Sequence, residues 1–265
     1  MKNLLILFVC LICVKCKKSN ESQIKNVLFE SIDSNYSGID FTNQLSYKPY
    51  LNIIEYLYYY NGGGVAVGDI NNDGLEDIFF TANQEIDRLY LNMGNFKFKD
   101  ITRQAKLDLS PSWSNGVTMD DVNNDGFIDI YVSKLPMEGL FKNQSTHNLL
   151  YINNGDLTFT ESSSDYGLDF LGFSTQSTFF DYDRDGDLDM YLMNHATHSV
   201  RSYGTTKKRK EKDSLSGDRL YENLLDEGKN EFKEVTEKSG ILSSPLGYGL
   251  AITTTDINDD GWLDI

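Results

Sequence analysis

The nine-residue sequence DINNDGLED at residues 69–77 occurs in four versions along this chain of 265 residues. The other three are DVNNDGFID at 121–129, DYDRDGDLD at 181–189 and DINDDGWLD at 256–264. All four have the form D-x-[ND]-x-D-G-x-x-D, and their first residues are 52, 60 and 75 positions apart. That spacing is near or above the length of one four-stranded repeat unit, so the pattern predicts a repeat protein.

The residues around each acidic stretch predict the same strands every time. A short apolar segment precedes each copy, and β-prone runs follow at 78–80, 130–132 and 190–192. A Tyr-x-Asn motif with a turn and a Phe comes next, which is typical of a hairpin. Each unit should therefore run strand A, acidic loop, strand B, variable loop, strand C, turn, strand D. With 16 Tyr, 15 Phe and only 4 Pro, we expect an all-β fold, and repetition at this length favours a β-propeller of four-stranded blades.

These motifs resemble a known family. The acidic loop between two strands, followed by Tyr-x-Asn, a turn and Phe, is similar to the FG-GAP/VCBS repeat of integrin α subunits, and more closely to bacterial cartilage acidic protein-like proteins that carry an ASPIC/UnbV domain. The segments SGIDFTN at 37–43 and YYYNGGGVAVGDINNDG at 58–74 also resemble the start of that propeller. The resemblance implies seven blades in the family. Three complete repeats and part of a fourth predict an incomplete fragment of about three and a half blades.

The acidic loops predict calcium sites. Calcium prefers about six to eight hard oxygen ligands on a flexible loop. Positions 1, 3, 5 and 9 offer side-chain oxygens, position 7 a backbone carbonyl, and the Gly at position 6 permits a sharp turn. The expected ligands are Asp69, Asn71, Asp73, Leu75 and Asp77; Asp121, Asn123, Asp125, Phe127 and Asp129; Asp181, Asp183, Asp185, Asp187 and Asp189; and Asp256, Asn258, Asp260, Trp262 and Asp264.

Two other interpretations of the acidic loops compete with this one. An EF-hand needs a Glu at position 12 and a following helix, whereas position 12 is Phe80, Val132 or Leu192 within strand-like runs. The remaining alternative is an acidic turn that holds no metal. Four intact copies favour calcium, and loop three, with five Asp, should bind it most tightly.

The amino-terminal sequence predicts export. Lys2 precedes an apolar run at 4–14, which is too short to cross a bilayer as a mature helix. Residues 1–16 are interpreted as a signal peptide with a lipoprotein-like Cys16 as lipidation site, 17–60 as a tether with the first strands, and 61–265 as the propeller repeats. Plain secretion and a retained anchor are the alternatives. All three cysteines lie in this segment, so a mature surface lipoprotein of a bacterium would have no disulfide framework.

Net charge and isolated motifs limit the possible functions. The net charge of −16 repels nucleic acid and attracts cations. His195, His198 and Arg201 could serve a polysaccharide-processing enzyme, but we expect the two histidines to be surface-loop residues, and the basic run at 207–212 to be a solvated loop. The variable loops at 133–148 and 194–218 are the expected binding surface. The sequence thus favours a cell-surface recognition or adhesion module for a protein or glycan ligand, with a purely structural spacer as a further alternative.

Overall fold

Residues 28–136, 147–196 and 209–265 are described by the structure, a computed structural model. The chain divides into two compact units, 1–32 and 33–265. Of the first unit only 28–32 are described, and these are exposed and form no helix or strand. In the described parts of the chain, no helix has the length and apolarity needed to cross a membrane. The predicted signal peptide and Cys16 lie outside the described residues.

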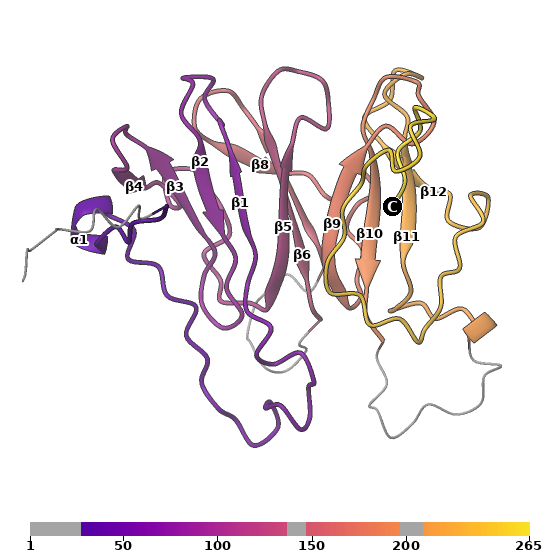
Figure 1. Cartoon of the computed structure of the whole chain (residues 1–265), viewed down its shortest axis with the longest axis horizontal. Coiled ribbons are helices and arrows are strands. Elements are labelled where there is room, and N and C mark those ends of the chain that lie inside the picture. Colours follow the sequence, from indigo (N-terminus) through magenta and orange to yellow (C-terminus); the bar gives the residue numbers. More distant parts are fainter. Residues whose placement is uncertain (1–27, 137–146, 197–208) are drawn as a thin grey trace, which may run out of the picture. The chain divides into compact units, whose positions relative to one another are not determined.

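Three four-stranded antiparallel sheets make up most of the second unit (Figure 1). In each sheet the strands are hydrogen-bonded in chain order. The first sheet contains β1 (Val65–Gly68), β2 (Asp77–Phe80), β3 (Arg88–Asn92) and β4 (Phe98–Asp100). The second contains β5 (Ser114–Asp120), β6 (Asp129–Lys134), β7 (Leu149–Asn153) and β8 (Phe159–Glu161). The third contains β9 (Ser174–Phe180), β10 (Asp189–Asn194), β11 (Arg219–Asn223) and β12 (Phe232–Glu234).

The register of strand pairing is the same in all three sheets. The Tyr of each Tyr-x-Asn motif lies opposite an acidic residue, in the pairs Tyr90–Asp100, Tyr151–Glu161 and Tyr221–Glu234. The predicted order of strand A, acidic loop, strand B, variable loop and hairpin is therefore confirmed in all three units. These sheets are blades of an incomplete β-propeller, which confirms the predicted all-β fold class.

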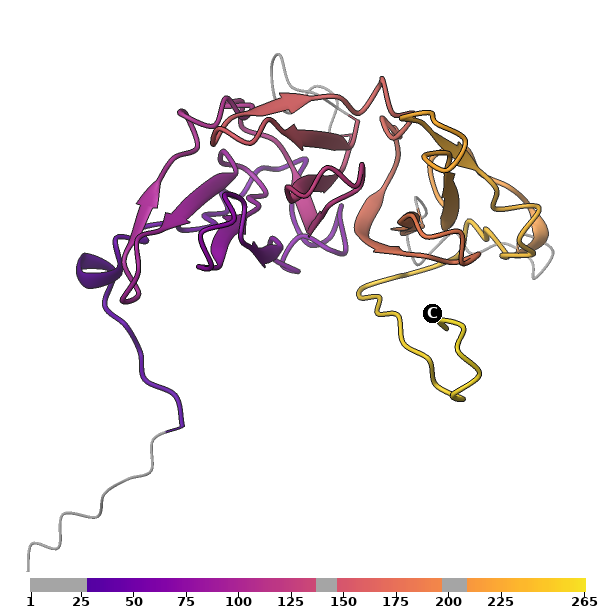
Figure 2. The ribbon, with the colours of Figure 1, turned by 90° about the horizontal axis from the view of Figure 1, so that it is seen from above.

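Each blade needs its neighbour to bury its faces. On β6, Ile130 and Val132 join a core with β1–β4 residues such as Phe79, whereas Tyr131 joins a second core with β9–β12 residues such as Met190. Because successive strand side chains point to opposite faces, one strand supplies both cores. The first strands β1, β5 and β9 contact one another in turn, and Figure 2 shows the three sheets following one another.

Small residues permit the close approach of these first strands. A Cβ on Gly116 would lie 2.5 Å from the carbonyl oxygen of Thr175, and a Cβ on Gly64 would lie 2.7 Å from that of Asn115. Thr118 Oγ1 donates to the Ser177 carbonyl oxygen across the same boundary at 2.9 Å. Any larger side chain at either glycine would push neighbouring blades apart.

The segment before β1 differs from the sequence prediction. Strands were expected between residues 17 and 60, but the described part holds only the helix α1 (Ser34–Ser37) and an isolated bridge between Lys48 and Leu51. Leu51 and Tyr59 instead form a small core with Trp113 and Leu135. Aromatic packing against the blades, rather than strand pairing, fixes this segment.

The fourth repeat forms a loop but no sheet in the described residues. Its flanks are joined by one antiparallel bridge between Thr255 and Asp264, and Tyr248 bridges to His195 of the third blade. Leu250 and Ile257 are 67% and 75% exposed. Without neighbouring strands over them, these apolar residues have no core to join.

Candidate metal centre

The four acidic loops share one backbone conformation. Position 4 has positive φ in every copy, at Asn72 (58°), Asn124 (56°), Arg184 (68°) and Asp259 (61°). The Gly at position 6 does too, with φ between 82° and 98° across the four loops. Two such residues in close succession reverse the chain sharply, and glycine adopts this region without strain. The loop therefore folds back around its own first carboxylate.

The first Asp of each loop accepts backbone hydrogen bonds from the turn. In loop one, Asp69 Oδ1 accepts from the N–H of Asp73 at 3.0 Å, and Asp69 Oδ2 accepts from the N–H of Gly74 at 2.7 Å. Asp121 in loop two and Asp256 in loop four do the same. In loop three, Asp181 receives the N–H groups of Arg184 (2.6 Å) and Gly186 (3.2 Å). Each carboxylate is thereby held in place over the turn.

Positions 3 and 5 differ between loop three and the others. Asn71 Nδ2 donates to Asp73 Oδ2 at 3.0 Å, and loops two and four have the equivalent Asn–Asp bond. Loop three has Asp183 in place of this Asn, so no amide is present to donate to Asp185. Asp183 Oδ1 is buried and has no hydrogen-bond partner. Loop three thus has two adjacent carboxylates where the other loops have an Asn amide bonded to one Asp carboxylate.

In each of the three complete blades, the last Asp of the acidic loop is buried at the start of strand B. Asp77, Asp129 and Asp189 are at most 1% exposed. Asp129 Oδ2 accepts from the Val122 N–H (3.1 Å), and its Oδ1 accepts from the Asn153 N–H (2.8 Å). The N–H of Asn92 and that of Asn223 bond Asp77 and Asp189 in the same way. The Tyr-x-Asn motif therefore holds the base of the acidic loop.

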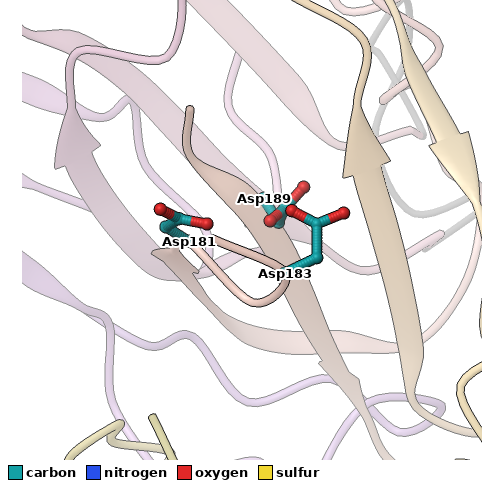
Figure 3. Close-up of side chains that lie close together, drawn as sticks. All are labelled: Asp181, Asp183 and Asp189. Atoms are coloured by element: carbon teal, nitrogen blue, oxygen red, sulfur yellow. The ribbon is translucent and has the colours of Figure 1, made fainter. Parts of the chain in front are cut away.

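Loop three gathers three of its carboxylates. Ligand atoms of Asp181, Asp183 and Asp189 all lie within 4.8 Å of one another. In Figure 3 the carboxylates of Asp183 and Asp189 lie next to each other, with Asp181 across the turn. These three were predicted as ligands at positions 1, 3 and 9, and the fold brings them together. Such spacing suits a hard cation held by oxygen ligands.

Burial raises the pKa of several loop carboxyls. The pKa of Asp129 rises to about 7 and that of Asp189 to about 7, first because burial disfavours the charged form and then because neighbouring loop aspartates repel it. The pKa of Asp77 and that of Asp183 are also raised, again mainly by burial. A cation among these groups would favour their ionised forms and so offset both effects.

At position 7 of each loop, the backbone carbonyl was predicted as a ligand. The side chains at this position point toward other turns. A Cβ on Gly94 would lie 3.9 Å from Leu75 Cδ1, and one on Gly155 would lie 2.9 Å from Phe127 Cζ. The Trp262 ring of loop four lies under the guanidinium of Arg184 in loop three, at 4.2 Å. Asn72 donates to the Gly126 carbonyl oxygen, so loops one and two also touch.

The Asn of the Tyr-x-Asn motif has a role that the sequence alone did not reveal. Asn153 Nδ2 donates to the Ile70 carbonyl oxygen of the preceding blade's loop (2.8 Å) and to Ile128 O of its own loop (3.0 Å). Asn223 does the same with Val122 (3.0 Å) and Leu188 (3.1 Å). Repetition of the Asn was the available signal, but its partner lies 83 or 101 residues away.

His195 is not a surface residue, which corrects the sequence interpretation. It is 2% exposed, its ring stacks on Tyr58 with centroids 4.3 Å apart, and its Nε2 lies 3.2 Å from the Tyr56 hydroxyl. Burial lowers its pKa to about 4. The amino-terminal segment covers it, which the local sequence could not indicate. His198 and Arg201 lie outside the described residues.

The repeat geometry agrees with comparisons to known proteins. Residues 69–132, from the first acidic loop to β6, match the FG-GAP-like repeat family. The chain contains FG-GAP-like repeats. Cartilage acidic protein 1 of Mus musculus is 27% identical over 215 residues, and that of Homo sapiens is 28% identical over 210 residues. These matches cover 78% of this chain but only 28% of the length of those relatives.

The FG-GAP-like repeat also explains why the acidic loops and Tyr-x-Asn motifs recur together. The family match contains loops one and two and the Tyr-x-Asn motif of the first blade. Loops three and four, which lie beyond the matched residues, have the same reversal and the same bond from the Gly N–H to their first Asp. All three complete blades are therefore copies of one structural unit.

Proposed function

We propose that the chain is a calcium-binding β-propeller module of the cell surface that recognises a protein or glycan. The main support is the gathering of Asp181, Asp183 and Asp189 within 4.8 Å of one another. The same backbone reversal in all four loops supports extending calcium binding to each. With every cysteine in the first 16 residues, bound cations would take the part that disulfides play elsewhere.

Recognition is assigned to the connections between the second and third strands of each blade. These loops vary in length while the strands that support them keep one register. Variable loops on a rigid scaffold are where binding specificity usually lies. An exported lipoprotein with Cys16 as its anchor fits this function, because it would place the module outside the cell.

The enzyme alternative gains no support from His195. Its ring is packed among Tyr56, Tyr58 and Phe173, and its Nδ1 lies 2.9 Å from the Ala196 carbonyl oxygen. A general base needs access to substrate, whereas this imidazole is enclosed. A recognition role therefore remains the better proposal.

The calcium proposal is tested by melting curves and by counting bound ions. Calcium binds the folded loop better than the unfolded chain, so a hundredfold excess over Kd should stabilise the fold by about 2.7 kcal/mol per site. Magnesium should substitute poorly, because it demands tighter octahedral geometry. Asp73→Ala, Asp125→Ala and Asp183→Ala should each remove one ion in titration calorimetry.

Asp156→Ala is the matched control, since this exposed aspartate lies on the β7–β8 turn outside the acidic loops. It should leave the number of bound ions unchanged. An identical melting curve in calcium and in excess chelator, with no ion detected, would overturn the calcium proposal. Glycan and surface-protein arrays probed with and without calcium then test recognition.

A further inference from the structure

The third blade has an acidic feature that the other two lack, in the turn of its hairpin. Six positions separate Asn92 from Phe98, and six separate Asn153 from Phe159, but nine separate Asn223 from Phe232. The extra residues bring Asp226 next to loop three, where its N–H donates to Asp187 Oδ2 at 3.1 Å. The same turn in blades one and two carries a glycine beside an apolar side chain, Leu75 or Phe127.

Asp187 therefore takes the place of an apolar residue. It stands at position 7, where the other loops have Leu75, Phe127 and Trp262. Asp187 is 4% exposed, and its Oδ1 is buried with no hydrogen-bond partner. A buried carboxylate oxygen without a partner is costly unless a cation or a donor compensates it.

Asp187 is also close to two other carboxylates. Ligand atoms of Asp185, Asp187 and Asp226 all lie within 4.8 Å of one another. Within the described ranges, no ion pair reaches any of the three, and Lys229 on the same turn is bonded to Glu227 at 2.5 Å. The part of the chain that the structure describes thus supplies no positive partner to this group.

We propose that Asp185, Asp187 and Asp226 bind a second calcium ion, beside the ion assigned to loop three. Asp185 would be shared between the two ions, and water would complete the oxygen ligands that calcium requires. The second site rests on the proposed function only through Asp185, the one side chain that both ions would share. Asp187 would bind the second ion through its carboxylate rather than its backbone carbonyl, and Asp226 is not part of the repeated loop. This second ion would join the acidic loop of the third blade to its hairpin.

The test counts ions in the purified full chain titrated with calcium chloride alone. Asp187→Leu copies loop one at this position and keeps the backbone carbonyl, and Asp226→Asn removes only a charge. Each should lower the number of bound ions by one, whereas Asp185→Ala should lower it by two. Glu227→Gln, an equal change on the same turn, is the matched control and should bind as many ions as the native chain.

Melting curves separate a ligand from a purely structural Asp187. In chelator, Asp187→Leu should melt at or above the native temperature, because a buried carboxylate without a partner has been removed. Adding calcium should raise the melting temperature of the native chain by more than it raises that of the variant. Loss of folding in Asp187→Leu would shift the test to Asp226→Asn.

Each outcome decides the second site separately from the calcium proposal. Ions lost in Asp73→Ala and Asp125→Ala but not in Asp187→Leu or Asp226→Asn would overturn the second site and leave the loops as calcium sites. Ions lost only in Asp187→Leu, Asp226→Asn and Asp185→Ala would support the second site and overturn calcium binding at loops one and two. Absence of any bound calcium would overturn both.

Discussion

His195 shows how one residue can join distant parts of the chain. It lies just beyond the end of β10, and its backbone pairs with Tyr248 of the fourth repeat, while its ring contacts Tyr56 and Tyr58 of the amino-terminal segment. Three segments far apart in sequence therefore meet at this one residue. This position couples the amino-terminal segment to the third blade.

His195→Ala should destabilise the fold by about 2 to 4 kcal/mol, because it leaves a cavity among aromatic rings and removes the polar contact to Tyr56. The measurement is the free energy of unfolding in denaturant. Tyr47→Ala, at a side chain that is 72% exposed, is the control and should change stability by less than about 0.5 kcal/mol. Equal values for the two variants would contradict the packing described for His195.

Asp129 should make the calcium-free fold less stable as pH rises. Its folded pKa of about 7 lies above the unfolded value of about 3.9, so the folded state binds more protons between these values. The stabilising contribution is complete below about pH 4 and is lost as pH rises through about 7. Asp189, with a folded pKa of about 7, acts in the same direction.

The measurement is the free energy of unfolding in chelator between pH 5 and 7. Asp129→Asn cannot titrate, so its stability should fall less steeply with pH than that of the native chain. Saturating calcium should also reduce the slope, since the ion keeps the native carboxylates ionised. A native slope that matches the variant's in chelator would contradict the raised pKa.

At the scale of elements, the hairpin strand C connects neighbouring blades. Asn153 on β7 and Asn223 on β11 each donate one amide hydrogen bond to the loop of the preceding blade. Among the described residues, the side chain of Asn92 on β3 bonds within its own blade, to the Glu76 carbonyl oxygen and the Gly94 N–H. All three Asn donate to the carbonyl oxygen at position 8 of their own loop, and Asn153 and Asn223 add a bond across the blade boundary.

Asn153→Ala and Asn223→Ala should each cost more stability than Asn92→Ala. The expected excess is about 1 to 3 kcal/mol, because a buried carbonyl of the neighbouring blade also loses its partner. Thermal and denaturant unfolding of the three variants measure it. If all three variants lose the same stability, the bond across the boundary contributes nothing beyond the bonds within each blade.

At the scale of the whole molecule, apolar side chains of the first and fourth repeats are left exposed. Val65 and Val67 on β1 are 61% and 58% exposed, while Ala66 between them packs on the core shared by the first two blades. A row of exposed apolar side chains on a strand favours association with other chains. We therefore expect the exposed face of the first blade to favour aggregation.

The chain should self-associate with rising concentration, and replacing Val65 and Val67 together with Thr should reduce this. Threonine keeps the β-branched shape but adds a polar group. Sedimentation velocity over a range of concentrations measures the effect. Ile54→Thr, at a more exposed residue in the amino-terminal segment (85%), should not reduce it, and a native chain that stays monomeric throughout would contradict the prediction.

The sequence alone determined the repeat, the strand order, the hairpin at each Tyr-x-Asn motif and the position of the acidic loops. These features are local, since alternation and turn residues act within a few positions of one another. Only the tertiary structure decided that Asn153 bonds Ile70 and that Asp187 meets Asp226. It also decided that His195 is buried by the amino-terminal segment. Those contacts arise when a blade covers its neighbour, and no local pattern encodes which distant residue completes a buried polar group.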